Sequence, residues 1–80
     1  MAMTFLESYI KKHDIRPGER FEIVRKRDGI VMGVFWIEYM EHYGPVLTTS
    51  PDSYWTAAET LQKLSKHMCY ARKLVAWRII

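Results

Sequence analysis

Apolar residues near the start of the chain recur at the spacing of an amphipathic helix. Thr4 and Glu7 stand three positions apart where this pattern begins, which is the spacing of a capping box. Asp14 and the pair Pro17-Gly18 come after the pattern and favour a stop followed by a turn. The predicted helix would bury one face, which carries Phe5, Leu6, Tyr9, Ile10 and His13.

A β-hairpin is predicted after this helix. Residues 20–27 and 30–40 are rich in strand-forming side chains, and Asp28-Gly29 between them is a strong turn signal. The second segment also fits a helix face, so an alternative is that the chain becomes helical from about Glu38, with Gly44 as its C-terminal cap. Strand propensity favours the hairpin. The residues that would form the alternative helix face are Met32, Phe35, Trp36, Tyr39 and Met40.

The rest of the chain predicts a strand, a helix and a last strand. Residues 46–49 form a short strand, and Ser50-Pro51 has the residue types preferred at the start of a helix. The apolar stripe of that second helix would be Tyr54, Ala57, Ala58, Leu61, Leu64, Ser65 and Met68. Residues 74–80 read as the final strand, with Val75, Trp77 and Ile79 on one face.

These elements predict one small α+β domain over residues 1–80. Their order is α-β-β-β-α-β, with two helices on one face of an antiparallel sheet of three to four strands. Half of the composition, 49%, is hydrophobic, and Trp36, Trp55 and Trp77 are bulky candidates for the core. The longest nearly apolar stretch, residues 30–37, is far shorter than the ~20 residues of a membrane-spanning helix.

The single cysteine and the N-terminus indicate a cytoplasmic setting. Cys69 has no second cysteine with which to form an internal disulfide, so folding needs no oxidising compartment. The first residues lack the basic start and the long apolar run of a signal peptide. The expected location is therefore the cytoplasm, which would be that of the host cell if a phage encodes the protein.

Charge is sorted into blocks along the chain. Residues 29–62 hold four acids and no lysine or arginine, whereas residues 63–80 hold five bases and no acid. Such a surface attracts partners of opposite charge but says little about the fold. Two basic groups, one at the hairpin tip and one after the second helix, form a predicted basic patch of Arg25, Lys26, Arg27, Lys63, Lys66, Arg72 and Lys73.

The basic patch suggests contact with nucleic-acid phosphates, with Tyr70 and Trp77 as stacking residues. The element order α-β-β-β-α is similar to that of double-stranded-RNA-binding domains. That family begins its second helix with lysines, whereas this chain has Pro51-Asp52 there. A small nucleic-acid-binding protein that contacts the backbone of DNA or RNA is therefore kept as the alternative function.

Catalytic and metal-binding patterns are weak. His67 and Cys69 are two positions apart and supply too few ligands for a structural zinc site, which His13 or His42 could complete only by tertiary proximity. Cys69 would lie at a helix C-terminus, where the dipole disfavours a thiolate. No glycine-rich phosphate loop is present. We therefore expect no catalytic residue, no metal and no cofactor, and a protein that is not an enzyme.

Aromatic residues favour an interface. Tyrosine and tryptophan are the residues from which protein interfaces draw most of their binding energy, and this short chain holds five tyrosines and three tryptophans. An exposed acidic and aromatic patch would contain Glu38, Tyr39, Glu41, His42 and Tyr43. A protein-binding module is therefore the first functional hypothesis.

The N-terminal segment also carries a family resemblance. Residues 4–10, Thr-Phe-Leu-Glu-Ser-Tyr-Ile, and residues 15–23, Ile-Arg-Pro-Gly-Glu-Arg-Phe-Glu-Ile, resemble the start of small uncharacterised accessory proteins of bacteriophages. The resemblance covers about twenty residues and assigns no site residue. It implies stoichiometric binding to a host protein or nucleoprotein complex, and the specific form considered is an inhibitor of a host defence complex such as a CRISPR effector (an anti-CRISPR protein).

Overall fold

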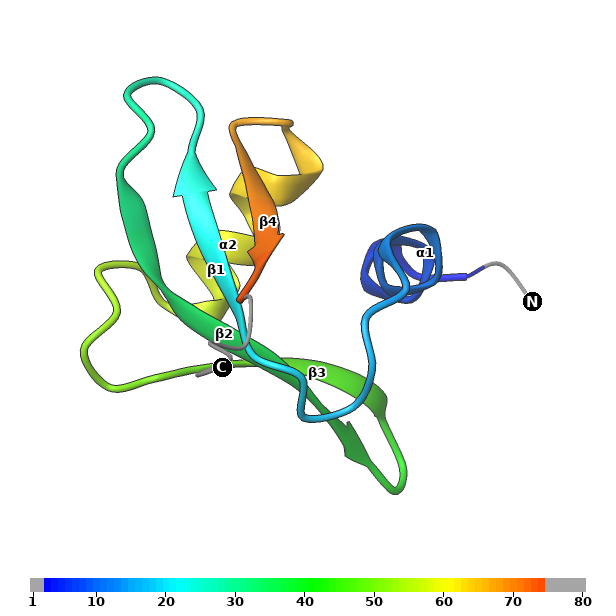
Figure 1. The fold of residues 1–80 in the computed structure, drawn as a ribbon. Helices are drawn as coiled ribbons and strands as arrows, with labels where there is room; N and C mark the ends of the chain where they lie inside the picture. The colour runs from blue at the N-terminus through cyan, green and yellow to red at the C-terminus, as the bar shows by residue number, and fades with distance from the viewer. Residues whose placement is uncertain (1–2, 75–80) are drawn as a thin grey trace, which may run out of the picture.

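Four antiparallel strands and two helices form the domain (Figure 1). The structure is a computed structural model, and it describes residues 3–74. The strands stand in the order β3-β2-β1-β4, so β3 and β4 are the two edges of the sheet. The elements are α1 Phe5–His13, β1 Phe21–Arg25, β2 Val31–Met40, β3 Gly44–Thr49, α2 Ala57–Ser65 and β4 Cys69–Lys73. The order α-β-β-β-α-β is the predicted one.

Helix α1 begins as the capping box predicts. The Thr4 hydroxyl accepts a hydrogen bond from the Glu7 backbone N–H at 3.2 Å, and the Glu7 carboxylate accepts one from the Thr4 backbone N–H at 3.2 Å. The helix ends at Asp14, which adopts the left-handed conformation with φ 51°. The basic residues of the last turn then lie at the negative end of the helix dipole.

Strands β1 and β2 form the predicted hairpin, and β2 stays extended as far as Met40. Phe21 pairs with Phe35, and the register shifts between Ile23 and Val24. The alternative of a helix from Glu38 is wrong, because Glu38 and its neighbours pair with β3 as far as Gly44. Strand propensity and cross-strand pairing therefore outweigh the helical periodicity of this segment.

The loop of residues 50–56 lies across β2 at the register shift and contacts Gly33, the glycine inside that strand. Gly33 has φ +150°, and a Cβ atom there would overlap the Ser53 side chain and lie 3.0 Å from the Ser53 Cα. The loop is held by backbone hydrogen bonds from Tyr54 N–H to Met32 C=O and from Ser50 N–H to Val34 C=O. Glycine is required here because the loop backbone comes so close.

This loop explains why helix α2 begins later than predicted. Ser50 and Tyr54 bond to β2, and helix α2 begins only at Ala57, so the predicted start at Ser50-Pro51 is wrong. Thr56 caps the helix, and its hydroxyl accepts a hydrogen bond from the Glu59 backbone N–H at 3.1 Å. The buried face carries Thr60 and Leu64, with Leu61 half-buried, while Tyr54 and Met68 of the predicted stripe are exposed.

The fourth strand lies earlier in the chain than predicted. Strand β4 pairs along the whole of β1, with Arg25 opposite Cys69 and Phe21 opposite Lys73. His67, with φ 58°, provides the left-handed turn from α2 into this strand, and the next N–H bonds back to the Lys63 carbonyl. The predicted strand over residues 74–80 begins where β4 has ended, and residues 75–80 of it, with Trp77, lie outside the described residues.

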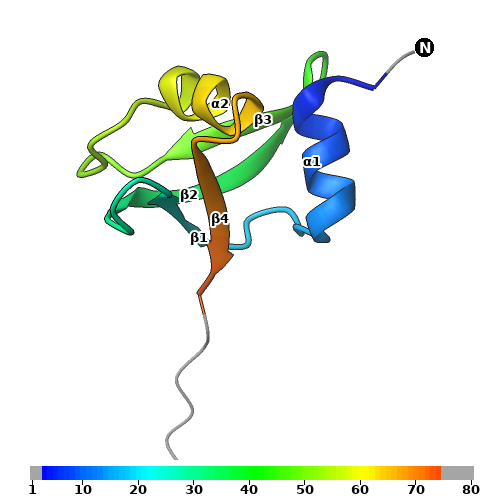
Figure 2. The ribbon, with the colours of Figure 1, turned by 90° about the horizontal axis from the view of Figure 1, so that it is seen from above.

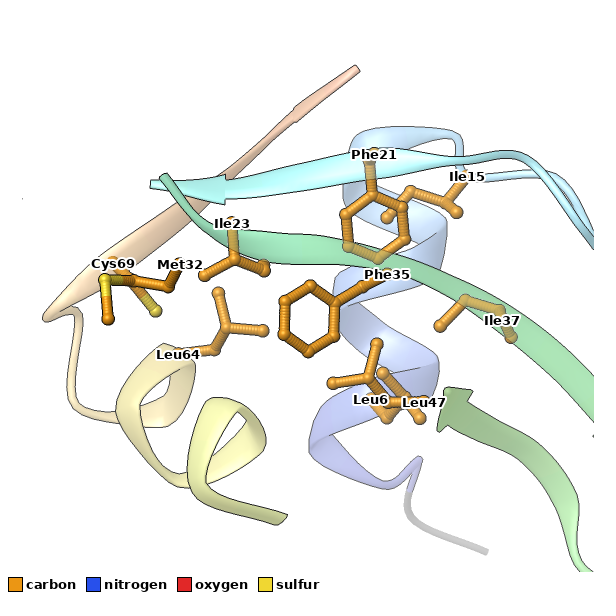
Figure 3. Close-up of a cluster of buried hydrophobic side chains, with 10 residues drawn as sticks. All are labelled: Leu6, Ile15, Phe21, Ile23, Met32, Phe35, Ile37, Leu47, Leu64 and Cys69. Atoms are coloured by element: carbon orange, nitrogen blue, oxygen red, sulfur yellow. The ribbon is translucent and has the colours of Figure 1, made fainter. Parts of the chain in front are cut away.

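The core lies between the sheet and both helices (Figure 3). Its buried cluster consists of Leu6, Ile15, Phe21, Ile23, Met32, Phe35, Ile37, Leu47, Leu64 and Cys69. Leu6 of α1 and Leu64 of α2 belong to the same cluster, which places the two helices on one face of the sheet, as predicted. Trp36 and Trp55, which the sequence predicted in the core, are half-buried at its margin. Phe21 and Phe35 are the large aromatic side chains that are fully buried there.

The long strand β2 runs between two ends of the molecule. In Figure 1 the β1–β2 loop and the connection from α2 to β4 lie together at one end, and the β2–β3 hairpin lies at the other. Helix α1 stands on the side of the β2–β3 hairpin in Figures 1 and 2. Within residues 3–74, no helix has the length and apolar character needed to cross a bilayer.

Candidate functional sites

The tip of the first hairpin meets the end of α2. The Lys26 backbone N–H donates to the Met68 carbonyl at 3.1 Å, which ties the β1–β2 loop to the chain after α2. A hollow of about 270 Å³ opens between them, and we call it the basic groove. It is lined by Arg25, Lys26, Arg27, Trp55, Lys63 and Met68. The structure thus brings together four of the seven residues of the predicted basic patch.

Arg25 and Lys63, two cations of the basic groove, have different interaction partners. The Arg25 guanidinium makes two hydrogen bonds to the Asp28 carboxylate, and this pairing lowers the pKa of Asp28 to about 2. Arg25 is therefore largely neutralised by its neighbour. The Lys63 ammonium lies 5.1 Å from the centre of the Trp55 ring, in a cation–π arrangement that leaves its charge uncompensated.

Arg72 and Lys73 do not join the basic groove. They occupy the far end of β4, where Arg72 pairs with Glu22 at 2.9 Å and Lys73 with Glu19 at 3.6 Å. Each charge is thus balanced by an acid that precedes or belongs to β1. The seven predicted residues are therefore divided. Four of them line the basic groove, Arg72 and Lys73 are paired with acids at the far end of β4, and Lys66 is exposed at the C-terminal cap of α2.

The predicted acidic and aromatic patch lies at the opposite end, around the β2–β3 hairpin. Glu38 and Tyr39 are neighbours in a strand, so they point to opposite faces of the sheet. The Glu38 carboxylate accepts a hydrogen bond from the Trp36 indole N–H at 3.0 Å, whereas Tyr39 lies against α1 in a shallow hollow with Ile10 and Lys11. Glu41 and His42 are in the turn that joins the strands. The five residues therefore surround the hairpin end and do not share one flat face.

This hairpin end exposes more apolar surface than the sequence pattern indicated. Tyr43 at the turn is 83% exposed, and Tyr39 and Met40 are each about half exposed. Val46 of β3 and Met3 before α1 add further exposed apolar side chains. The sequence pattern placed Met40 and Val46 within predicted strands and assigned Met3 to no element, so it did not indicate that these side chains are exposed. We call these residues, Met3, Tyr39, Met40, Tyr43 and Val46, the hairpin patch, which extends around both faces of the hairpin end because the neighbours Tyr39 and Met40 point to opposite faces.

A second cavity, of about 280 Å³, lies between α1 and the start of β4. We call it the α1–β4 cavity. Phe5, Tyr9 and Tyr70 supply aromatic walls, and Lys12 and Lys26 supply cations. His13, His67 and Cys69 also line the cavity. His67 and Cys69 are two positions apart in the sequence, and His13 is far from both. Nothing in the sequence spacing indicated that α1 would meet β4.

The chemistry of Cys69 in this cavity is that of a buried apolar group. Cys69 lies in β4 and not at a helix end, which corrects the predicted placement. Burial raises the pKa of the thiol above its ordinary value, in spite of Lys26 and Lys63 nearby. A nucleophilic cysteine needs the opposite shift. Within residues 3–74, no three His, Cys, Asp or Glu side chains come close enough together to hold a metal ion.

No protein family model, curated protein or solved structure matches this chain. The candidate sites of this protein are the hairpin patch, the basic groove and the α1–β4 cavity.

Proposed function

We propose that this protein is a non-enzymatic protein-binding module and that the hairpin patch is its contact surface. The observation that carries the proposal is the exposure of Tyr43, 83%, at the tip of a hairpin whose neighbouring residues are also apolar and exposed. A large aromatic side chain in this position gains hydrophobic free energy when a partner covers it. Tyrosine also keeps its hydroxyl available for a hydrogen bond at the rim of an interface.

The setting of the hairpin patch suits a protein partner. The strands β2 and β3 hold Tyr39, Met40 and Val46 on a ladder of paired residues that extends to the Met40–Gly44 pair, so few residues need to be ordered on binding. Glu38 and Glu41 stand beside it, and neither takes part in an ion pair within residues 3–74. Exposed acids beside an aromatic patch favour a partner with a basic surface.

The specific form that we propose is a phage-type inhibitor of a host nucleoprotein complex. Proteins that bind nucleic acid carry basic channels, and an acidic, aromatic hairpin end complements such a channel. The resemblance of residues 4–23 to phage accessory proteins supports a bacterial partner. Binding of this kind needs no catalytic residue in the inhibitor.

Site-specific photo-crosslinking tests this proposal. A photoreactive phenylalanine analogue replaces Tyr43 in one variant and Tyr54 in the other, since Tyr54 is 79% exposed and lies away from the hairpin, in the loop before α2. In a bacterial lysate, we expect a discrete crosslinked protein from position 43 and none from position 54. Equal crosslinking from both positions, or crosslinking from position 43 to a second copy of this chain alone, would contradict the proposal.

The basic groove supports a second candidate, the binding of nucleic-acid phosphates. The observation that favours it is the meeting of Lys26, Arg27 and Lys63 around Trp55. Because such contacts reach only the backbone, affinity for duplex DNA or RNA should fall steeply between about 50 and 200 mM salt. Lys63→Glu should abolish that binding, and Lys11→Glu on α1 should not. Salt-insensitive, sequence-selective binding would exclude a contact limited to phosphates.

A further inference from the structure

We propose that the α1–β4 cavity is a nucleotide-binding site, in which one nucleobase stacks on the aromatic side chains and its phosphate is held by Lys12 and Lys26. This site is distinct from the hairpin patch, so it does not depend on protein binding. It shares Lys26 with the basic groove, and the experiment below separates the two.

The wall that helix α1 contributes is a ladder of rings. Phe5, Tyr9 and His13 stand four residues apart and therefore lie on one helix face. The Phe5 and Tyr9 ring centres are 5.8 Å apart, and the Tyr9 and His13 ring centres are 4.2 Å apart with an angle of 33° between the planes. Tyr70, 41% exposed on β4, also lines the cavity. Aromatic rings along a cavity favour a flat aromatic ligand, because bases of every kind stack on them.

The charge of the cavity selects an anion. Lys12 and Lys26 line it, and among the described residues that do so none is acidic. Neither lysine takes part in an ion pair within residues 3–74. The His13 and His67 imidazoles add further polar atoms to the lining. A neutral aromatic ligand would leave two cations without a partner, whereas a nucleoside phosphate satisfies both the rings and the charges.

The size of the cavity limits the ligand to one nucleotide unit. Its volume of about 280 Å³ is slightly below the ~300 Å³ at which the range for small-molecule sites begins. A dinucleotide cofactor is too large for it. A free mononucleotide and a single nucleotide of a bound strand have the same chemistry, and both fit this description.

A hydrogen bond holds the α1 and β4 walls of the cavity together without a ligand. The Tyr9 hydroxyl accepts a hydrogen bond from the Ala71 backbone N–H at 3.1 Å, which sets the distance between α1 and β4. Cys69, 3% exposed, closes the apolar side together with Leu64 of α2. A preformed wall reduces the entropy that is lost on binding.

An NMR titration of the ¹⁵N-labelled full chain tests the proposal. The probes are adenosine monophosphate, adenosine, inorganic phosphate and a short single-stranded oligoadenylate. We expect adenosine monophosphate to shift the amide signals of Tyr9, His13, Lys26 and Tyr70, and adenosine and phosphate each to do so far more weakly. Tighter binding of the oligoadenylate at the same amides would identify a strand as the source of the nucleotide, and tighter binding of the monophosphate would identify the free nucleotide.

Two matched charge reversals test the assigned cation. Lys12→Glu should weaken binding of adenosine monophosphate by about tenfold or more, which corresponds to ~1.4 kcal/mol. Lys11→Glu makes the same change on the neighbouring residue, which lines the hollow beside Tyr39 instead, and should leave the affinity near that of the unchanged protein. Lys63→Glu changes a residue that lines the basic groove and not the cavity, so it should weaken binding far less than Lys12→Glu does. The proposal is overturned if no probe shifts the cavity amides, if phosphate alone shifts them as strongly as the nucleotide, or if Lys11→Glu and Lys12→Glu weaken binding equally.

Discussion

The hydroxyl oxygen of Tyr9 accepts a hydrogen bond from the backbone N–H of Ala71 at 3.1 Å, which joins α1 to the edge strand β4 across 62 positions of sequence. Among residues 3–74, β4 pairs with β1 on one side and with no strand on the other, where this N–H lies. The tyrosine satisfies it in the way that another strand would. Burial raises the pKa of Tyr9 above its ordinary value of 10.0.

Removing this hydroxyl should destabilise the protein. Tyr9→Phe leaves the Ala71 N–H without its acceptor in a partly buried place, and we expect a loss of about 1–2 kcal/mol in the free energy of unfolding. Urea denaturation followed by fluorescence measures it. Tyr70→Phe is the control, because it removes a hydroxyl from an exposed ring on β4, the strand that contains Ala71. Equal losses in the two variants would show that the hydrogen bond contributes nothing of its own.

Gly33→Ala should cost more than an ordinary glycine substitution. The new Cβ meets the Ser53 side chain and backbone, and the alanine must adopt an unfavourable φ of +150°. We therefore expect the free energy of unfolding to fall by about 3 kcal/mol or more. Gly18→Ala separates strain from overlap, because Gly18 has φ +76° with open space around it, and it should cost about 1–2 kcal/mol. If thermal unfolding gives the same loss for both, the loop does not press on Gly33.

Cys69 should behave as a packed apolar side chain. Because burial raises the pKa of its thiol, reaction with a disulfide reagent at pH 8 should be much slower in the folded protein than in urea. Cys69→Ala should cost about 1–2 kcal/mol of stability, since only a small group is removed. Retained partner binding by this folded variant is expected. Loss of binding without loss of fold would assign the thiol a direct role.

The Arg25–Asp28 pair should affect the response to acid. The pKa of Asp28 is about 2 in the folded protein, below its ordinary value of 3.8, so the folded state binds this proton less tightly than the unfolded state. The contribution to stability is therefore present above pH 3.8 and is lost as the pH falls through about 2. Carboxyl ¹³C NMR measures the titration.

Two arginine variants identify the cause of the low value. Arg25→Gln should move the Asp28 titration up toward 3.8, because Arg25 donates both short hydrogen bonds. Arg27→Gln should move it little, since the Arg27 guanidinium is 3.9 Å away and mostly exposed. A larger shift in the Arg27 variant would reverse the assignment.

Local signals predicted much of this fold. The Thr4–Glu7 capping box fixed the start of α1, and the Asp28-Gly29 turn fixed the first hairpin, because each depends on a few neighbouring residues. The start of α2 was wrong, since Ser50 N–H bonds to β2 and the loop crosses the Gly33 backbone. Such tertiary contacts override a good local helix signal.

Tertiary proximity also decides which parts of the sites were predictable. Lys26 and Lys63 belong to two predicted basic groups, but their meeting depends on the β1–β4 pairing, which the sequence placed later in the chain. The left-handed turn at His67 carries no glycine and so gave no signal for the end of α2. The α1–β4 cavity was not predictable for the same reason.

The comparison of Tyr43→Ser with Tyr54→Ser is the most direct test of the proposed function. Both variants replace an exposed tyrosine, 83% and 79% exposed, so neither should change the stability of the domain. The measurement is the affinity of each variant for the protein that crosslinks to position 43. We predict that Tyr43→Ser weakens binding by about tenfold or more, as expected for a residue near the centre of an interface, and that Tyr54→Ser binds like the unchanged protein. Unchanged binding by Tyr43→Ser would contradict the assignment of the hairpin patch as the contact surface.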